Sequence, residues 1–221
     1  INDVNTNTTV LEYLRNFKNL KGTKEGCASG DCGACTAVIA EVKNNTLKYK
    51  SINTCITLLY SLHSKQLLTV EYIESKYLHP VQQSMVDNDG AQCGFCTPGF
   101  IMSMYAMYKN KIRPTESNIN RYLSGNLCRC TGYRPIKEAL KNLKKYKNLE
   151  SDTLKVIRKL KKIKLNDIVI GNNETKFFIH QNLKSFKKDF IKSKNPSLLV
   201  GGTDISLDIT KKRKNLNEIF Y

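Results

Sequence analysis

Hydrophobic and polar positions along the chain divide it into three segments of different character. In residues 1–75, β-type runs at 36–42 and 66–73 predict two strands joined by glycine-rich loops. The apolar stretch 10–15 follows the polar residues 7–9, which predicts a helix with a side-chain cap at its N-terminus. This segment is expected to form a small α+β unit.

Residues 76–147 have the hydrophobic periodicity of helices rather than of strands. The apolar positions on one predicted helix face are Phe100, Ile101, Met104, Met107 and Tyr108, and those on another are Ile136, Ala139, Leu140 and Leu143. A helical domain is therefore expected here.

The third segment starts with a Lys-rich stretch, 148–165, that is poor in large aromatic residues and is expected to be a linker. Beyond it, the patterns predict strands at 167–170 and 176–180, a helix over 183–194 and a strand at 197–200 that runs into two glycines. Residues 166–221 are thus expected to begin a third unit that the sequence does not complete.

Charge and composition narrow the class of protein. The chain has 36 Lys and Arg against 19 Asp and Glu, but its basic residues are dense at 141–164 and 211–214 rather than on one folded face. A solvated surface is therefore preferred to a nucleic-acid partner. No apolar run is long enough to span a membrane and no secretory signal is visible, so we expect a cytoplasmic protein without a membrane partner.

Both ends of the sequence are unusual. It begins without methionine and ends in the apolar run 219–221, so we expect a fragment of a longer protein. A partial or decaying gene product is the alternative.

The first candidate for chemistry is a group of four cysteines: Cys27, Cys32, Cys35 and Cys55. The first three have the Cys-x4-Cys-x2-Cys spacing of plant-type ferredoxins, which predicts a [2Fe–2S] cluster. Glycines at 26, 30 and 33 allow one tight loop to point three thiolates inward. A zinc site is disfavoured because zinc sites normally use Cys-x2-Cys pairs, and the spacing between Cys27 and Cys32 is too long for one. Disulfides are disfavoured because they need an oxidising compartment, and no signal directs the chain to one.

A second group consists of Cys93, Cys96, Cys128 and Cys130. Two pairs of thiolates suit zinc as well as a cluster when taken alone. However, Thr97 is a candidate N-cap with Pro98 at the first helical position, and residues 131–135 lead into a helix expected to start at Ile136. Both pairs would lie at helix N-termini, whose partial positive charge favours an anionic cluster.

The motifs 22–36, 92–99 and 125–133 resemble the iron–sulfur domains of the xanthine dehydrogenase family, the molybdenum hydroxylases. This resemblance implies an α+β multidomain fold: a β-grasp plant-type ferredoxin-like domain over 1–75, an α-helical [2Fe–2S]-binding domain over 76–147, and the start of an α+β FAD-binding domain. It also implies that the first cluster lies toward a flavin and the second toward molybdopterin, which Gln92 and Cys130 would face. The alternative for Gln92 is an ordinary polar residue beside a loop.

The run that starts within the last predicted strand resembles the first phosphate loop of the family's FAD domain; it consists of Leu198, Leu199, Val200, Gly201, Gly202, Thr203, Asp204 and Ile205. Glycines let backbone N–H groups approach a pyrophosphate closely. Two departures from the family stand out. A β-hairpin expected before Val4 is absent, and the FAD domain ends soon after this loop, so tight FAD binding is not expected.

The resemblance implies an electron-transfer subunit similar to the small subunit of bacterial xanthine dehydrogenases. It would relay electrons from molybdopterin through two [2Fe–2S] clusters to FAD and NAD during xanthine or hypoxanthine oxidation. Its partner would be a molybdopterin-binding large subunit, in a heterotetramer of two small and two large subunits. No catalytic residue is expected, and the histidines at 63, 79 and 180 are expected to have surface or packing roles.

Two alternatives stay open. One is the iron–sulfur subunit of an aldehyde hydroxylase or another N-heterocycle hydroxylase, because the molybdenum subunit sets the substrate. The other is a binding protein without redox function that zinc or disulfides stabilise.

Overall fold

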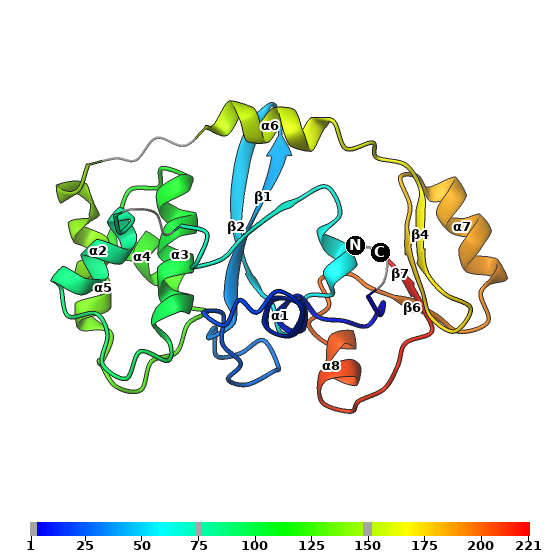
Figure 1. Ribbon diagram of the computed structural model, residues 1–221, viewed down its shortest axis with the longest axis horizontal. Helices are drawn as coiled ribbons and strands as arrows, with labels where there is room; N and C mark the ends of the chain where they lie inside the picture. Colours follow the sequence, from blue (N-terminus) through cyan, green and yellow to red (C-terminus); the bar gives the residue numbers. More distant parts are fainter. Residues whose placement is uncertain (1–3, 74–76, 148–151) are drawn as a thin grey trace.

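The computed structural model describes residues 4–73, 77–147 and 152–221. Three groups of elements lie side by side along its long axis (Figure 1): a group of helices, a central three-stranded sheet, and a second sheet that carries the C-terminus. The sheet of the first segment thus lies in the middle, between the helices of the second segment and the sheet of the third.

The central sheet has the strand order β2-β1-β3, formed by β1 (Thr36–Lys43), β2 (Thr46–Asn53) and β3 (Gln66–Leu68). Strand β1 confirms the predicted run at 36–42, whereas β3 is shorter than the run 66–73. Strand β2 was not predicted. It pairs antiparallel with β1 from Thr36–Asn53 to Lys43–Thr46 across Asn44 and Asn45. These asparagines have φ of 48° and 58°, which a two-residue type I′ hairpin turn requires.

Helix α1 (Val10–Glu12) starts as the sequence predicts. The Thr9 hydroxyl caps it by accepting a hydrogen bond of 3.1 Å from the Glu12 N–H. The chain continues as a wider π-helical turn over Tyr13–Phe17. An isolated bridge between Thr9 and Leu58 then attaches the start of the helix to the segment before the short 3-10 helix Leu59–Leu62.

The helical group consists of α2 (Pro80–Asp87), α3 (Thr97–Lys109), α4 (Glu116–Leu123) and α5 (Arg134–Lys141), followed by a 3-10 turn at Asn142–Lys145. Helix α3 is its centre and differs from the single apolar face that its sequence predicts. Every residue of α3 from Gly99 to Met107 is buried, because β1 and β2 cover one side and α2 and α4 cover the others. One core therefore joins the sheet to the helices: Val38 and Leu68 share it with Phe100 and Met104.

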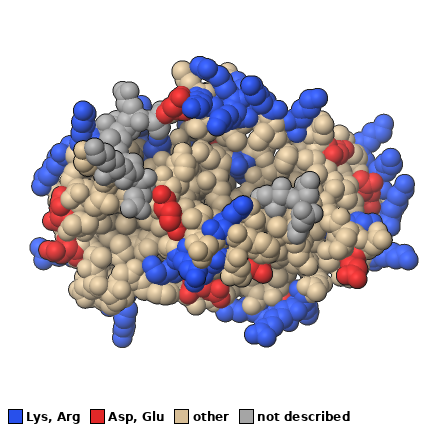
Figure 2. Space-filling view, viewed as in Figure 1, with Lys and Arg blue, Asp and Glu red and all other residues tan. Residues whose placement is uncertain are grey.

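The segment expected to be a linker, 148–165, contains helix α6 (Thr153–Lys161). This helix crosses β1 and β2 at their hairpin end (Figure 1), where Lys161 donates to the Asn45 side chain, and it buries Ile157 in the shared core. Its basic side chains are exposed and gather in one blue region of the surface (Figure 2); they are Lys155, Arg158, Lys159 and Lys161. The Lys-rich stretch thus has an apolar side that holds it to the protein. Residues 148–151 lie outside the described part.

The C-terminal sheet has the order β4-β5-β7-β6, from β4 (Ile168–Gly171), β5 (Lys176–Ile179), β7 (Glu218–Phe220) and β6 (Pro196–Leu198). Helix α7 (Leu183–Lys192) connects β5 to β6, so these elements confirm the predicted strand, strand, helix, strand order. Strand β7 and helix α8 (Ile205–Thr210) were not predicted. Leu58 and Tyr60 of the first unit pack with Phe177 and Ile219 of this sheet.

Among the described residues, no helix combines the length and the apolar character needed to cross a membrane.

Candidate metal centres

Four thiols converge on the loop between α1 and β1. Those of Cys27 and Cys32 interact directly, as do those of Cys35 and Cys55, and Cys27 also interacts electrostatically with Cys35 and Cys55. The structure therefore brings together all four cysteines of the first predicted group, which we call the first site.

Backbone N–H groups of the loop point at the Cys27 sulfur. Donors at Ser29, Asp31 and Cys32 lie 3.4, 3.3 and 3.4 Å from Cys27 Sγ, and the Cys27 N–H lies 3.4 Å from Cys32 Sγ. Burial opposes the charged form of Cys27, but hydrogen bonds from Ser29 and Cys32 outweigh it and lower its pKa to about 6. The loop is therefore suited to a thiolate before any metal binds.

The loop reaches this shape through backbone conformations that side chains rarely permit. Gly30 and Gly33 have φ of 83° and 71°, and Ala28, which is not a glycine, has φ of 52°. At Gly33 the limit is also steric, because a Cβ would lie 2.2 Å from the carbonyl oxygen of Gly125. The glycines expected to shape the loop are needed there, and Ala28 adds local strain next to Cys27.

Cys35 and Cys55 form the inner half of the first site and are only 1% and 3% exposed. The Cys55 thiol, more than any other group, lowers the pKa of Cys35, to about 7, while the same contact raises that of Cys55. Thr54, which is buried, donates its hydroxyl to the Cys35 carbonyl at 2.7 Å. This half of the site is part of the hydrophobic core.

The second group also converges, in the helical domain. The Cys93 thiol interacts with that of Cys130, and the Cys96 thiol with that of Cys128. Thr131 interacts with Cys128 Sγ through both its N–H and its hydroxyl, at 3.5 and 3.2 Å. We call these four cysteines the second site.

Both halves of the second site lie just before helices, with boundaries that differ from the prediction. Cys96, not Thr97, is the N-cap of α3, so Pro98 takes the second helical position. Helix α5 starts at Arg134 rather than Ile136, because Tyr133 makes the turn in a left-handed conformation with φ of 67° and Arg134 already has helical geometry.

The second site is more open than the first, because its outer cysteines are exposed whereas Cys27 and Cys32 are half-buried; Cys128 is buried in the shared core. Cys93 and Cys130 are exposed, and so is Gln92. Two large apolar side chains next to them are also exposed, Phe95 by 46% and Leu127 by 55%. Exposed apolar side chains close in sequence to exposed cysteines suit contact with another protein surface.

The loops of the two sites touch each other at a junction formed by Gly33, Gly99, Asn126 and Leu127. The Leu127 N–H donates to the Cys32 carbonyl at 2.9 Å. The buried Asn126 amide donates to the Gly33 carbonyl at 3.0 Å and to the Thr36 hydroxyl at 3.1 Å. Ser103 donates to the amide oxygen of Asn126 at 2.6 Å. Asn126 belongs to the motif 125–133, but the sequence pattern predicts no role for its side chain.

The donor sets fit two-iron clusters. All eight cysteines are free, and each site divides into two pairs of thiols. Each iron of a [2Fe–2S] cluster needs two protein ligands, so two pairs are the expected arrangement. Within the described ranges, no group of three or more His, Cys, Asp or Glu side chains is placed to hold a single metal ion.

The predicted phosphate loop follows β6 as expected. Gly201 and Gly202 have φ of 72° and 78°, Val200 is 80% exposed, and Thr203 and Asp204 also face solvent. A Cβ at Gly201 would meet nothing within 4 Å. The backbone at Gly201 is therefore open to a ligand, and the FAD contact stays a prediction.

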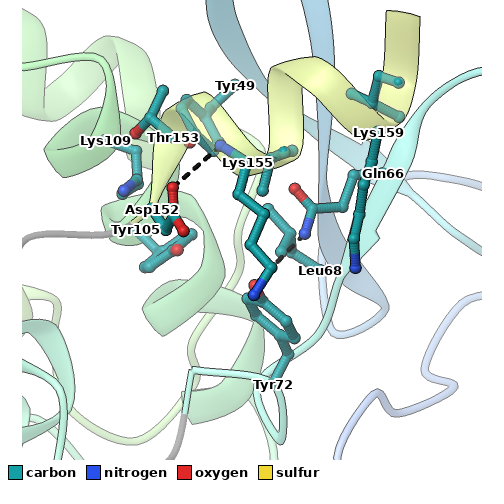
Figure 3. Close-up of a pocket in the computed structure, with 12 residues that line it drawn as sticks. Tyr49, Gln66, Leu68, Tyr72, Tyr105, Lys109, Asp152, Thr153, Lys155 and Lys159 are labelled. Carbon is teal, nitrogen blue, oxygen red and sulfur yellow. Dashed lines mark hydrogen bonds between the residues drawn. The ribbon is translucent and has the colours of Figure 1, made fainter. Parts of the chain in front are cut away.

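A pocket of about 480 Å³ lies between the central sheet, α3 and α6 (Figure 3). Phenol rings and lysines line it, among them Tyr49, Tyr105 and Lys109, and the Lys109 ammonium lies 5.3 Å from the centre of the Tyr49 ring. None of the eight cysteines lines this pocket, so it is separate from both metal sites.

Two family models match the chain. Residues 1–60 match the "2Fe-2S iron-sulfur cluster binding domain" and residues 69–141 match the "[2Fe-2S] binding domain". Each matched range contains one cysteine group. The predicted fold of a ferredoxin-like domain followed by a helical [2Fe–2S]-binding domain is confirmed, and neither match extends to the predicted FAD domain.

Curated relatives match a similar share of the chain. The xanthine dehydrogenase/oxidase of Mus musculus is 48% identical over 141 residues, and aldehyde oxidase 1 of Oryctolagus cuniculus is 49% identical over 142. Each alignment covers 62% of this chain and 11% of the relative. The chain thus aligns with about a tenth of the length of these relatives.

Two solved structures of oxidoreductases also match this chain. The aldehyde oxidoreductase of Desulfovibrio gigas matches with a TM-score of 0.57 and 32% identity, over 63% of this chain and 15% of that one. Quinoline 2-oxidoreductase of Pseudomonas putida 86 matches with a TM-score of 0.55 and 28% identity, over 72% of this chain and 87% of the other.

Proposed function

We propose that this chain, which contains the two iron–sulfur domains of the molybdenum hydroxylase family, relays electrons between a molybdopterin centre and a flavin. Its thiolates would hold one [2Fe–2S] cluster on Cys27, Cys32, Cys35 and Cys55 and another on Cys93, Cys96, Cys128 and Cys130. A [2Fe–2S] cluster, when bound, supplies one-electron transfer at low potential. The protein supplies ligands, N–H donors and the spacing between the sites.

The junction is the observation that carries this proposal. The Leu127 N–H bonds to the carbonyl of Cys32, a ligand of the first site, and Leu127 precedes Cys128, a ligand of the second. Backbone atoms and one hydrogen bond therefore connect the two ligand sets without intervening solvent. Two metal sites that only stabilised their own domains would not need this contact.

The different exposure of the two sites supports a direction of electron transfer. The second site opens toward solvent through Cys93, Cys130 and Gln92, with Phe95 and Leu127 beside them, and we assign this face to a molybdopterin-binding partner. The first site lies next to the C-terminal unit, where the loop 198–205 would bind FAD. Electrons would then pass from molybdopterin to the second cluster, to the first, and to FAD and NAD.

Substrate and assembly follow from resemblance alone. Xanthine or hypoxanthine is our proposed substrate, with a large molybdopterin subunit in a heterotetramer. The matched relatives include both xanthine dehydrogenases and aldehyde oxidases, and this region is similar in both. An aldehyde or N-heterocycle hydroxylase is the second candidate, because the residues that select a substrate lie outside these domains.

The test is reconstitution of the full chain with iron and sulfide under anaerobic conditions. Two clusters require four irons and four acid-labile sulfides per chain, visible absorption, and two distinct low-temperature electron paramagnetic resonance signals after reduction with dithionite. C55A should remove one signal and C93A the other. A colourless protein that takes up zinc instead would overturn the proposal.

A further inference from the structure

Helix α8 lies against the first site, although it belongs to the C-terminal unit (Figure 1). Leu207 of this helix packs on the small apolar cluster of Leu11, Cys35, Cys55 and Ile56. Lys211, the C-cap of α8, donates from its ammonium to the carbonyl of Cys27. One helix therefore contacts both halves of the first site.

The helical spacing explains how α8 does this. The Lys211 N–H bonds to the Leu207 carbonyl at 2.9 Å, so the two residues are one turn apart and share a face. Leu207 packs on the cluster that contains the two buried cysteines, and Lys211 reaches the loop that carries the other two. Gly202, just before α8, allows the close approach, since a Cβ there would lie 2.9 Å from Ser206 Oγ and 3.3 Å from the Ile56 carbonyl oxygen.

The neighbouring lysine has a different role. Lys212 forms an ion pair with Asp208 at 2.7 Å, one turn back on α8, so its charge is locally compensated. Within the described part of the chain, Lys211 has no such ion pair, and its hydrogen bond is to a backbone carbonyl of a metal-binding residue. Lys211 and Lys212 thus form a natural matched pair.

We propose that α8 is the outer wall of the first site and that Lys211 raises the reduction potential of the cluster there. This rests on the proposed function, because it needs a [2Fe–2S] cluster on Cys27, Cys32, Cys35 and Cys55. Reduction adds one negative charge to the site and breaks no bond, so a nearby ammonium stabilises the reduced form. Leu207 is a positioning residue that keeps water from the buried thiols.

The main experiment compares K211Q with K212Q in the full reconstituted chain. Both clusters are titrated with dithionite and followed by electron paramagnetic resonance, with signals assigned through C55A and C93A. K211Q should lower the equilibrium constant for reduction of the first cluster three- to tenfold, where tenfold corresponds to about 59 mV for one electron. K212Q should leave it unchanged, and the second cluster is the internal reference in every sample.

Salt and Leu207 provide independent readouts. Because Lys211 is exposed, 1 M salt should shrink the difference between wild type and K211Q. L207A should admit water, which favours the more charged reduced form and shifts the potential in the opposite direction from K211Q. It should also speed release of iron from the first site to a chelator, with the second site unchanged.

The outcomes separate the inference from its premise. A wild-type chain with only one cluster signal contradicts the proposed function itself. Two normal signals with equal potentials in wild type, K211Q and K212Q contradict the role of Lys211, as does an equal shift in both lysine variants. Equal iron content in all samples ensures that these comparisons are made on folded, loaded protein.

Discussion

The two metal sites use the same ligands in opposite surroundings. In the first, Cys35 and Cys55 are almost fully buried and the other two cysteines are half-buried. In the second, Cys128 is buried in the core but Cys93 and Cys130 are exposed. The first is shaped by a loop with left-handed residues, the second by the starts of two helices. Burial fixes the surroundings of a cluster, and exposure makes it accessible to a partner.

This difference implies that the sites contribute unequally to stability. Ligands that also form a core should make folding depend on the metal, because binding free energy then adds to folding free energy. Ligands at a solvent-facing rim should be separable from folding. Four changes, described in order of decreasing expected effect, test this view.

Removing one ligand from each site should give the largest contrast. C55A loses the first cluster and leaves a space in the core, so we expect on the order of 4 kcal/mol or more of lost stability. C93A should lose the second cluster at a cost of about 1 kcal/mol, because Cys93 is exposed. Denaturant unfolding of both variants with matched iron analysis measures the contrast; equal losses would refute the inequality.

The next change compares one glycine from each loop. G33A places a methyl group 2.2 Å from the Gly125 carbonyl oxygen and also strains φ, so we expect a loss of about 3–5 kcal/mol. G94A is the control, since φ is 79° but a Cβ meets nothing within 4 Å, and about 1–2 kcal/mol is expected. Similar losses of stability for G33A and G94A would mean that the junction can rearrange to accept a Cβ.

Asn126 tests the contact between the sites. N126A removes the donor to Gly33 and Thr36 and leaves the Ser103 hydroxyl without its acceptor, so we expect about 2–3 kcal/mol of lost stability. It should also slow exchange of electrons between the clusters, measured by flash reduction of the loaded chain. N118A, whose amide bonds to Arg113 on the surface, should cost less than about 0.5 kcal/mol.

Lowering the pH should have the smallest effect on stability, and it should destabilise the helical domain first. His79 is buried as the N-cap of α2, and burial, with a smaller effect from Lys109, lowers its pKa to about 4. Because the ordinary value is 6.5, the unfolded state takes up the proton first, and stability falls as pH drops from about 6.5 toward 4. By pH 5 the loss should be about 2 kcal/mol.

His79→Asn keeps a capping side chain and removes the titration. Its unfolding free energy should therefore change less between pH 7 and pH 5 than that of the wild type. Hydrogen exchange should show faster opening of α2 than of β1 in the wild type at pH 5. An identical pH profile for both proteins would exclude His79 as the source.

The sequence predicted the chemistry better than the packing. Cysteine spacing divided the eight cysteines into two groups, and the structure brings each group together, while their role as cluster ligands stays a prediction. The apolar run 36–42 identified strand β1. The Asn44-Asn45 turn could have indicated β2, because two asparagines with positive φ are typical of hairpins. Helix α6 was hidden by its lysines, since only Ile157 and its neighbours reveal an apolar side.

The features that sequence reasoning missed join distant residues. Asn126 bonds to Gly33 across 93 positions, and Lys211 reaches Cys27 across 184. Periodicity and capping patterns describe neighbours along the chain and carry no information about such pairs. The role of Asn126 as a link between sites, and of α8 as a wall, therefore needed three-dimensional structure.

The backbone contact at Gly33 also bears on how these domains can change over generations. Inserting or deleting one residue in either loop would shift the Gly33 carbonyl or the Leu127 amide by about 3.5 Å, the length of one residue. The junction has no free space for such a shift, because even a Cβ added at Gly33 would overlap the Gly125 carbonyl oxygen. We therefore expect a change of loop length on one side to require a compensating change on the other, which would make the two domains evolve as one unit rather than as exchangeable modules.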